Sequence, residues 1–283
     1  IVLAVLVYIN PLFTIPFTMV CYFISYQFMF PVAYAYTDKQ MLFEFLALYG
    51  FFVAVRPLIR GRTMDFIFIA LCLIGAYYFF PGLEKLAVGA DSHVNWIFDN
   101  DLQHYVIFSY EKGWLAFRSQ ELVYLMADIV TALRIPFQLF TIIVELGAIF
   151  IVLLRRRGAM TILILAVMLH FGIMVSSGVF FWKWMGLDLA MAWFLWKVGN
   201  SDEIAPIFSL VPILISLAII TSGAFLFDVI HLGWWNSSIH GYYKFDVIDT
   251  QGDRYDFAYS QLQPYDFAIT QNRLYFINPN DSI

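Results

Sequence analysis

Charged side chains interrupt the long apolar stretches of this 283-residue sequence. A charge at the centre of a bilayer costs about 2.5–3.5 kcal/mol on insertion scales, so each such residue needs a partner or a function. The charged residues that share an apolar neighbourhood are Glu44, Asp65, Glu84, Lys85, Asp128, Arg134, Glu145, Lys183, Asp188 and Asp228, and His170 joins them.

Lys85 is the strongest candidate for a catalytic residue. It follows an aromatic stretch that ends in Pro81-Gly82, and Trp96 comes shortly after it. Burial disfavours the charged ammonium form of lysine, and a neutral amine can act as a general base. The structural alternative is a lysine that extends to the lipid headgroups beside Glu84, with Trp96 as an interface anchor. Periodicity alone favours this alternative.

His170 and Glu145 are the other two candidate catalytic residues. His170 lies inside an apolar stretch, where it either hydrogen-bonds a substrate group or relays a proton, or is a neutral histidine bonded to a neighbouring helix. Glu145 either orients a polar cavity, or forms a structural ion pair for which Arg134 is the expected partner, or is protonated; the last two are favoured. Lys183 and Asp188 are five residues apart, outside the helical spacings of three and four, so we expect both at the membrane interface.

The sequence gives no support for a metal site. His93 and His104 flank an acidic segment, but their spacing matches no standard ligand pattern. His231 and His240 bracket two tryptophans typical of an aromatic belt at a membrane surface. We also find no nucleophile elbow, phosphate-binding loop or nicotinamide fingerprint.

The composition indicates that most of the chain is dissolved in lipid. Hydrophobic residues make up 61% of the sequence and charged residues only 13%, against about 45–50% and about 25% in soluble domains. These values exclude a disordered chain, a coiled coil and a nucleic-acid binder. Cys21 and Cys72 lie in apolar runs, where they are expected to be reduced packing residues.

We predict an all-α polytopic membrane protein, a helical bundle of about seven spans, the first of them truncated, with a small C-terminal antiparallel β unit. Ile1 to Ile9 read as the end of a span whose beginning is missing. Apolar stretches of bilayer length recur along the chain, although Lys183 and Asp188 make the sixth less certain. The predicted spans are 12–36, 41–56, 64–84, 135–154, 159–179, 180–198 and 205–229.

Two short basic loops predict the orientation. One contains Arg56, Arg60 and Arg62, and the other is Arg155, Arg156 and Arg157. Positive loops face the cytoplasm, and the two spans between these loops allow both to do so. The acidic segment 85–123 is then extracytoplasmic. The side on which the tail lies depends on whether 180–198 crosses.

The composition changes after about residue 233, so we divide the chain into a helical domain, 1–233, and a small extramembrane tail, 234–283. Alternating residues at 241–249 and 254–259, separated by a turn sequence at 250–253, predict a β-hairpin. A second strand pair is expected at 267–270 and 273–277. A unit this small holds little core alone, so we expect it to pack on the helices.

Three patches of sequence resemble one membrane-protein family. The sequence YFFPGLEKL at 78–86, followed by Trp96, resembles the region around the proposed catalytic lysine of the vitamin K-dependent γ-carboxylases and of the wider horizontally transferred transmembrane (HTTM) domain family. LHFGIM at 169–174, followed by GVFFWKWM at 178–185, is similar to that family's later histidine-containing helix. IIVEL at 142–146 is similar to its acidic helix. The resemblance covers about residues 12–230.

The resemblance implies a chemistry and a cofactor. In the carboxylases a lysine amine deprotonates a reduced vitamin K, oxygen turns the quinol into a strong base and finally an epoxide, and that base removes a γ-proton from a protein glutamate, which then takes up CO2. Lys85 alone carries over directly. A reduced, vitamin K-like quinone is the implied cofactor, and a peptide or protein is the implied substrate.

This chain also departs from the carboxylase pattern. It has Thr37-Asp38-Lys39-Gln40 where those enzymes have an Asn-His pair, and Gln138 where they have a further histidine. The small tail stands where they have a large propeptide-binding domain. These departures favour an HTTM-like relative over a glutamate carboxylase.

Three functions stay open at this point. The first is a membrane enzyme with Lys85 as base and with His170 and Glu145 lining its cavity. The second is a non-enzymatic membrane subunit that binds or helps to mature a partner protein or peptide, with the tail as its docking surface. The third, a transporter, is weaker because no internal repeat is found.

Overall fold

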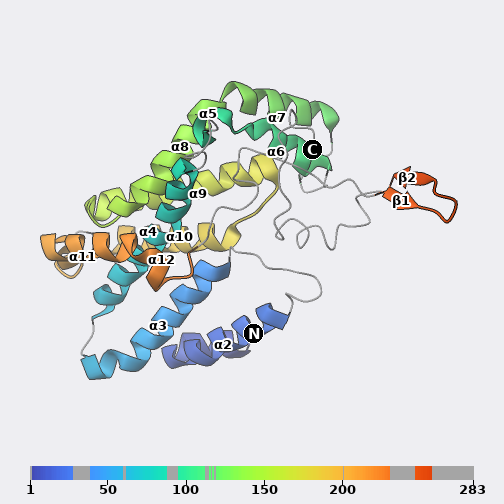
Figure 1. Cartoon of the computed structure of the whole chain (residues 1–283). Helices are drawn as coiled ribbons and strands as arrows, with labels where there is room; N and C mark the ends of the chain where they lie inside the picture. The colour runs from blue at the N-terminus through green and yellow to red at the C-terminus, as the bar shows by residue number, and fades with distance from the viewer. Residues whose placement is uncertain are drawn as a thin grey trace.

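The computed structural model describes residues 2–27, 39–59, 62–87, 95–111, 115, 117, 119–199, 201–229 and 246–256. The described chain is mostly helical and carries one two-stranded antiparallel sheet near its C-terminal end (Figure 1). The predicted all-α membrane architecture with a small β unit is confirmed in these general terms.

Helix α4, Thr63–Ala87, forms the centre of the bundle. In its most apolar stretch, 67% of the residues are buried inside the protein, against 33% for α9 and 17% for α3. Figure 1 shows α4 between α8 above it and α3 and α2 below it. The helices that pack against α4 are α3 (Gln40–Ile59), α8 (Arg134–Gly147), α11 (Leu210–Thr221) and α12 (Gly223–Leu226).

The remaining elements surround this centre. Helix α9 packs on α10 and also contacts α8 and α6, so the four form one connected layer. The bounds of these elements are α1 (Val2–Ile9), η1 (Pro11–Phe13), α2 (Thr14–Gln27), α5 (Trp96–Asp99), α6 (Leu102–Glu111), α7 (Gln120–Ala132), η3 (Ala148–Phe150), α9 (Arg155–Ser177), α10 (Trp182–Val198) and η4 (Ala205–Phe208).

Three of the described helices are long and apolar enough to cross a membrane, namely α3, α4 and α9. The chain is therefore consistent with an integral membrane protein. The bent pair α7 and α8 adds a fourth crossing if it is one span.

The predicted count of seven spans is not confirmed. Helix α10 has 17 residues, which at about 1.5 Å each give about 25 Å, less than a bilayer core of about 30 Å. The stretch 205–229 is divided into η4, α11 and α12, and the described part of 12–36 ends at residue 27.

A proline explains the bend of 69° between α7 and α8. Pro136 stands in the first turn of α8. A proline ring clashes with the carbonyl group four residues earlier, which here belongs to Ala132, the last residue of α7. Helix α7 therefore cannot continue unbroken into α8. The sequence predicts the start of a span at residue 135, one residue after the first residue of α8.

The β-hairpin of the tail is confirmed in its described part. Strand β1, Asp246–Ile248, pairs antiparallel with β2, Arg254–Asp256. In the turn, Asp249 accepts hydrogen bonds from the backbone N–H groups of Asp253 and Gln251, and these bonds hold the pKa of Asp249 below its usual range. The strands stand apart from the helices in Figure 1, so the expected packing on the helical body is not seen for them. The second predicted strand pair, at 267–270 and 273–277, lies outside the described residues.

Close contact between α4 and α8 depends on Gly82. A Cβ atom at this position would lie 2.8 Å from the Cβ of Glu145 and 3.2 Å from the backbone nitrogen of Leu146. Both neighbours belong to α8 and have little freedom to move. Gly172, in contrast, has no atom within 4 Å of the place where its Cβ would be.

We therefore expect Gly82→Ala to destabilise the bundle by about 1–3 kcal/mol, because α4 and α8 must separate to admit the methyl group. Gly172→Ala is the matched control, and its helix propensity should stabilise by up to about 1 kcal/mol. The midpoint of thermal unfolding in detergent measures both. Equal midpoints for the two variants would show that α4 and α8 are not in close contact at Gly82.

Candidate functional site

An ion pair between Lys85 and Glu145 lies inside the bundle where α4 and α8 meet. The Lys85 Nζ is 2.8 Å from one carboxylate oxygen of Glu145 and 2.9 Å from the other. Only 4% of the lysine side chain and 9% of the glutamate side chain are exposed. Gly82 stands one turn before Lys85 and lets the backbone of α8 approach, so the glutamate reaches the amine. Lys85 therefore faces the interior and does not extend to the headgroups.

Trp96 covers the same amine from a third element. The Lys85 Nζ lies 5.5 Å from the centre of the Trp96 ring, a cation–π arrangement. Trp96 is 4% exposed and is the first residue of α5. The side chain of Asn95 caps this short helix by accepting a hydrogen bond from the backbone N–H of Ile97. Trp96 therefore packs against the Lys85 amine and is also an aromatic residue near the end of a span.

Two contacts hold the α5–α6 junction against α8. The side-chain amide of Gln138 donates to the backbone carbonyl of Asn100 at 2.5 Å, and Arg134 forms an ion pair with Asp101. The expected pair between Arg134 and Glu145 is therefore wrong. The two residues are eleven positions apart, about three helical turns, and each instead pairs with a side chain outside α8.

His170 belongs to a second buried group with Tyr78 and Asp188. The Tyr78 hydroxyl lies 2.6 Å from the Oδ2 of Asp188 and 2.9 Å from the Nε2 of His170. Trp184 packs edge-on against both Tyr78 and His170, with ring centres 5.3 and 5.2 Å apart. The group joins three helices, because Tyr78 comes from α4, His170 from α9, and Asp188 and Trp184 from α10.

The two groups share one face of α4. Tyr78 and Lys85 are seven residues apart, which is close to two full helical turns, so their side chains lie one above the other, about 10 Å apart along the axis. We call the six residues Tyr78, Lys85, Glu145, His170, Trp184 and Asp188 the interior polar site.

Asp188 is the site residue that sequence analysis placed wrongly. It was expected at the interface with Lys183, but its side chain is fully buried. Helical spacing carried the missing signal. Trp184, Leu187 and Met191 recur at intervals of three and four, and all three are buried on the inner side of α10. Asp188 lies on that same side.

Several buried polar atoms of this region have no hydrogen-bond partner among the described residues. They include the Nδ1 of His170, the Oδ1 of Asp188 and the Nε1 of Trp184. Native proteins satisfy nearly all such groups. The interior polar site therefore contains hydrogen-bonding atoms that no described residue satisfies.

The described residues contain no group of three or more histidine, cysteine, aspartate or glutamate side chains that could hold a metal ion. His104 lies on α6 among these residues. His93, His231 and His240 lie outside the described residues.

Comparison of this chain with known protein families, curated proteins and solved structures finds no match.

Because Lys85 and Glu145 form an ion pair, each single substitution should destabilise the protein more than the double substitution does. Lys85→Met leaves a buried carboxylate without its counter-charge, and Glu145→Leu leaves a buried ammonium, so each should destabilise by about 3–5 kcal/mol. The double variant Lys85→Met/Glu145→Leu removes both charges and should recover most of that loss. Thermal unfolding of the four proteins in detergent measures the coupling.

The exposed pair Arg62–Asp65 is the control, because its side chains are 64% and 44% exposed. Breaking it should cost about 0–1 kcal/mol. Additive effects of the two substitutions at Lys85 and Glu145 would contradict the pairing.

Proposed function

We propose that this chain is an HTTM-like integral membrane enzyme in which Lys85 acts as a general base beside a reduced quinone. One observation carries the proposal: an amine buried in a lipid-soluble bundle is bound by both oxygens of a carboxylate from another helix. The patch YFFPGLEKL that contains this amine also carries the family resemblance.

Glu145 gives the amine a way to become a base. Lys85 donates hydrogen bonds to the Glu145 carboxylate, and transfer of one proton along such a bond breaks an N–H bond and forms an O–H bond. The products are a neutral amine and a neutral carboxyl group. Proton transfer of this kind neutralises both groups. It is favoured because separated charges are costly in a medium of low dielectric constant. The Lys85 Nζ can then accept a proton from a bound hydroxyl group.

The polar groups of the interior polar site support a reduced quinone as the cofactor. Such a cofactor would supply an acidic hydroxyl group and reducing equivalents. Lys85 and His170 would bind its hydroxyl groups, and Trp96 and Trp184 provide aromatic surfaces beside them. The bundle is rich in apolar side chains, and these exclude water from the amine.

The substrate that best fits the resemblance is a peptide or protein, modified by chemistry other than glutamate carboxylation. The expected carboxylase histidine is Gln138 here, and its amide is occupied by the carbonyl of Asn100. Gln138 therefore holds the α5–α6 junction in place. This role is structural and differs from that of a catalytic base.

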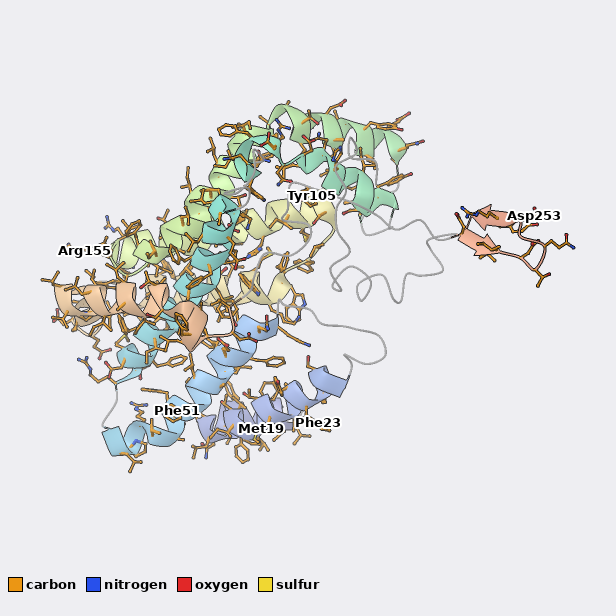
Figure 2. The ribbon with its side chains drawn as sticks, in the orientation of Figure 1. Met19, Phe23, Phe51, Tyr105, Arg155 and Asp253 are labelled. Atoms are coloured by element: carbon orange, nitrogen blue, oxygen red, sulfur yellow. The ribbon has the colours of Figure 1, made fainter. Side chains whose placement is uncertain are left out.

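The basic loops support a cytoplasmic position for residues 56–62 and 155–157, with segment 85–123 on the other side. Figure 2 labels Arg155 at one end of α9 and Tyr105 of α6 near its other end, an arrangement that supports this orientation. The interior polar site would then lie in the extracytoplasmic half of the membrane.

Cysteine labelling tests this orientation. Arg157→Cys and Gln120→Cys place a thiol at two exposed positions. A membrane-impermeant maleimide added to intact cells should label Gln120→Cys and leave Arg157→Cys unlabelled until the membrane is opened. The unsubstituted chain controls for Cys21 and Cys72. The reverse pattern would turn the proposed orientation around.

A second candidate function is a non-enzymatic subunit that binds a partner protein or peptide. The observation in its favour is the hairpin of the tail, where Val247, Ile248 and Tyr255 are about half exposed on a unit that stands apart from the helices. In this case the Lys85–Glu145 pair would only join α4 to α8.

Lys85→Arg separates the two candidates. Arginine keeps the positive charge and the hydrogen bonds to Glu145, but it stays protonated and cannot serve as a base. We expect aerobic consumption of reduced phylloquinone, assayed by chromatography with the chain in nanodiscs, to fall about 10²–10⁴-fold, while the unfolding midpoint stays near that of the wild type.

Lys197→Met is the control for this assay. Lys197 is exposed and lies over a tryptophan ring at 5.2 Å, an arrangement like that of Lys85 but on the surface. Its loss should leave quinol consumption unchanged. Wild-type consumption in Lys85→Arg, or none in the wild type itself, would favour the non-enzymatic subunit.

A further inference from the structure

The hydrogen-bond chain Asp188–Tyr78–His170 has no part in the exchange between Lys85 and Glu145. Its three residues come from three helices and are all buried. Side-chain networks of this kind are costly unless every member is satisfied. The hydrogen-bond chain is satisfied in its middle and open at both ends, where Nδ1 of His170 and Oδ1 of Asp188 are buried without a partner among the described residues.

The order of donors along this chain can be worked out from Asp188. A carboxylate only accepts hydrogen bonds, so the Tyr78 hydroxyl must donate its single hydrogen to the Oδ2 of Asp188 at 2.6 Å. The Tyr78 oxygen is then free only as an acceptor. His170, at 2.9 Å, must therefore donate from Nε2. This order holds with Asp188 as a carboxylate or with a proton on its Oδ1. A proton on Oδ2 would reverse the order and leave the hydrogen of His170 on Nδ1.

This order of donors determines whether the second nitrogen of His170, Nδ1, carries a hydrogen. A neutral imidazole that carries its hydrogen on Nε2 has a bare lone pair on Nδ1, which is an acceptor. Trp184, whose ring meets the His170 ring edge-on, contributes an unused N–H donor to the same group. The group thus contains one open acceptor and one open donor. A hydroxyl group can both donate and accept a hydrogen bond, so it suits such a group.

We infer that Asp188 and Tyr78 are positioning residues that fix His170 in its Nε2–H form, so that Nδ1 accepts a hydrogen bond from a hydroxyl-bearing ligand. The inference rests on the proposed function in one respect, namely that this ligand binds beside Lys85. The tautomer itself depends only on the hydrogen-bond chain.

Nitrogen NMR of the full chain in nanodiscs tests the tautomer. With ¹⁵N-labelled histidine, the His170 signals are found by their loss in His170→Gln, and couplings to the ring hydrogens distinguish Nδ1 from Nε2. We expect the wild type to show a protonated Nε2 and an unprotonated Nδ1 in a single form. Asp188→Ala and Tyr78→Phe should each convert this single form into a mixture of tautomers.

The wild-type spectrum is decisive even if these variants do not fold. A hydrogen on Nδ1, a mixture of tautomers or a doubly protonated ring in the unsubstituted chain would overturn the inference. An unchanged single tautomer in both folded variants would also overturn it, because Asp188 and Tyr78 would then have no effect on His170.

The ligand half of the inference is tested with menadiol, a small reduced quinone, under anaerobic conditions. Menadiol should shift the Nδ1 signal of His170, whereas its dimethyl ether, which has no hydroxyl hydrogen, should not. The same shift with both compounds, or with neither, would overturn the assignment of a hydroxyl-bearing ligand. If Lys85 is not a base, the Lys85→Arg assay of quinol consumption shows it, and the His170 tautomer is unaffected.

Discussion

The structure depends on one buried contact between opposite charges, Lys85 on α4 and Glu145 on α8. Removing either ion from water costs several kcal/mol, and their attraction repays this cost only when the geometry is good. Both carboxylate oxygens lie within hydrogen-bonding distance of the amine. The rest of the region serves this geometry. Gly82 allows the helices to approach, and Trp96 shields the amine.

The same constraint explains why the neighbouring elements are held so closely. The Gln138–Asn100 and Arg134–Asp101 contacts keep the short helix α5 over the end of the ion pair. Without them the amine would be open to water, and a hydrated lysine gains little from a carboxylate. The adjacent chain of Asp188, Tyr78 and His170 then extends the polar interior along the same face of α4.

The cost of burying charge was enough to find much of the candidate site from the sequence. It gave eleven candidates that include Lys85, Glu145 and His170, and the resemblance of the sequence patches pointed to these three. All three are buried in the bundle. It gave the wrong partner for Glu145, because pairing between helices depends on which faces meet, and 60 residues separate Lys85 from Glu145. It also misplaced Asp188, because the spacing to Lys183 was weighed and the spacing to Trp184 and Met191 was not.

Hydropathy predicted the helical class and the positions of α3, α4 and α9, since long apolar helices give a strong signal. The spans that it predicted are not confirmed where the described helices are short or broken, as in α10 and in the segments η4, α11 and α12. The turn at 250–253 was read correctly, because turn residues between two alternating stretches form a local signal. Contacts between distant segments have no such local signal.

Infrared difference spectroscopy in nanodiscs tests the central contact most directly. In the wild type, Glu145 should contribute the bands of a carboxylate, identified by their loss in Glu145→Gln. In Lys85→Met the buried group loses its counter-charge, so these bands should be replaced by the C=O band of a protonated carboxyl group. Carboxylate bands of Glu145 that are the same with and without Lys85 would contradict the ion pair and the account built on it.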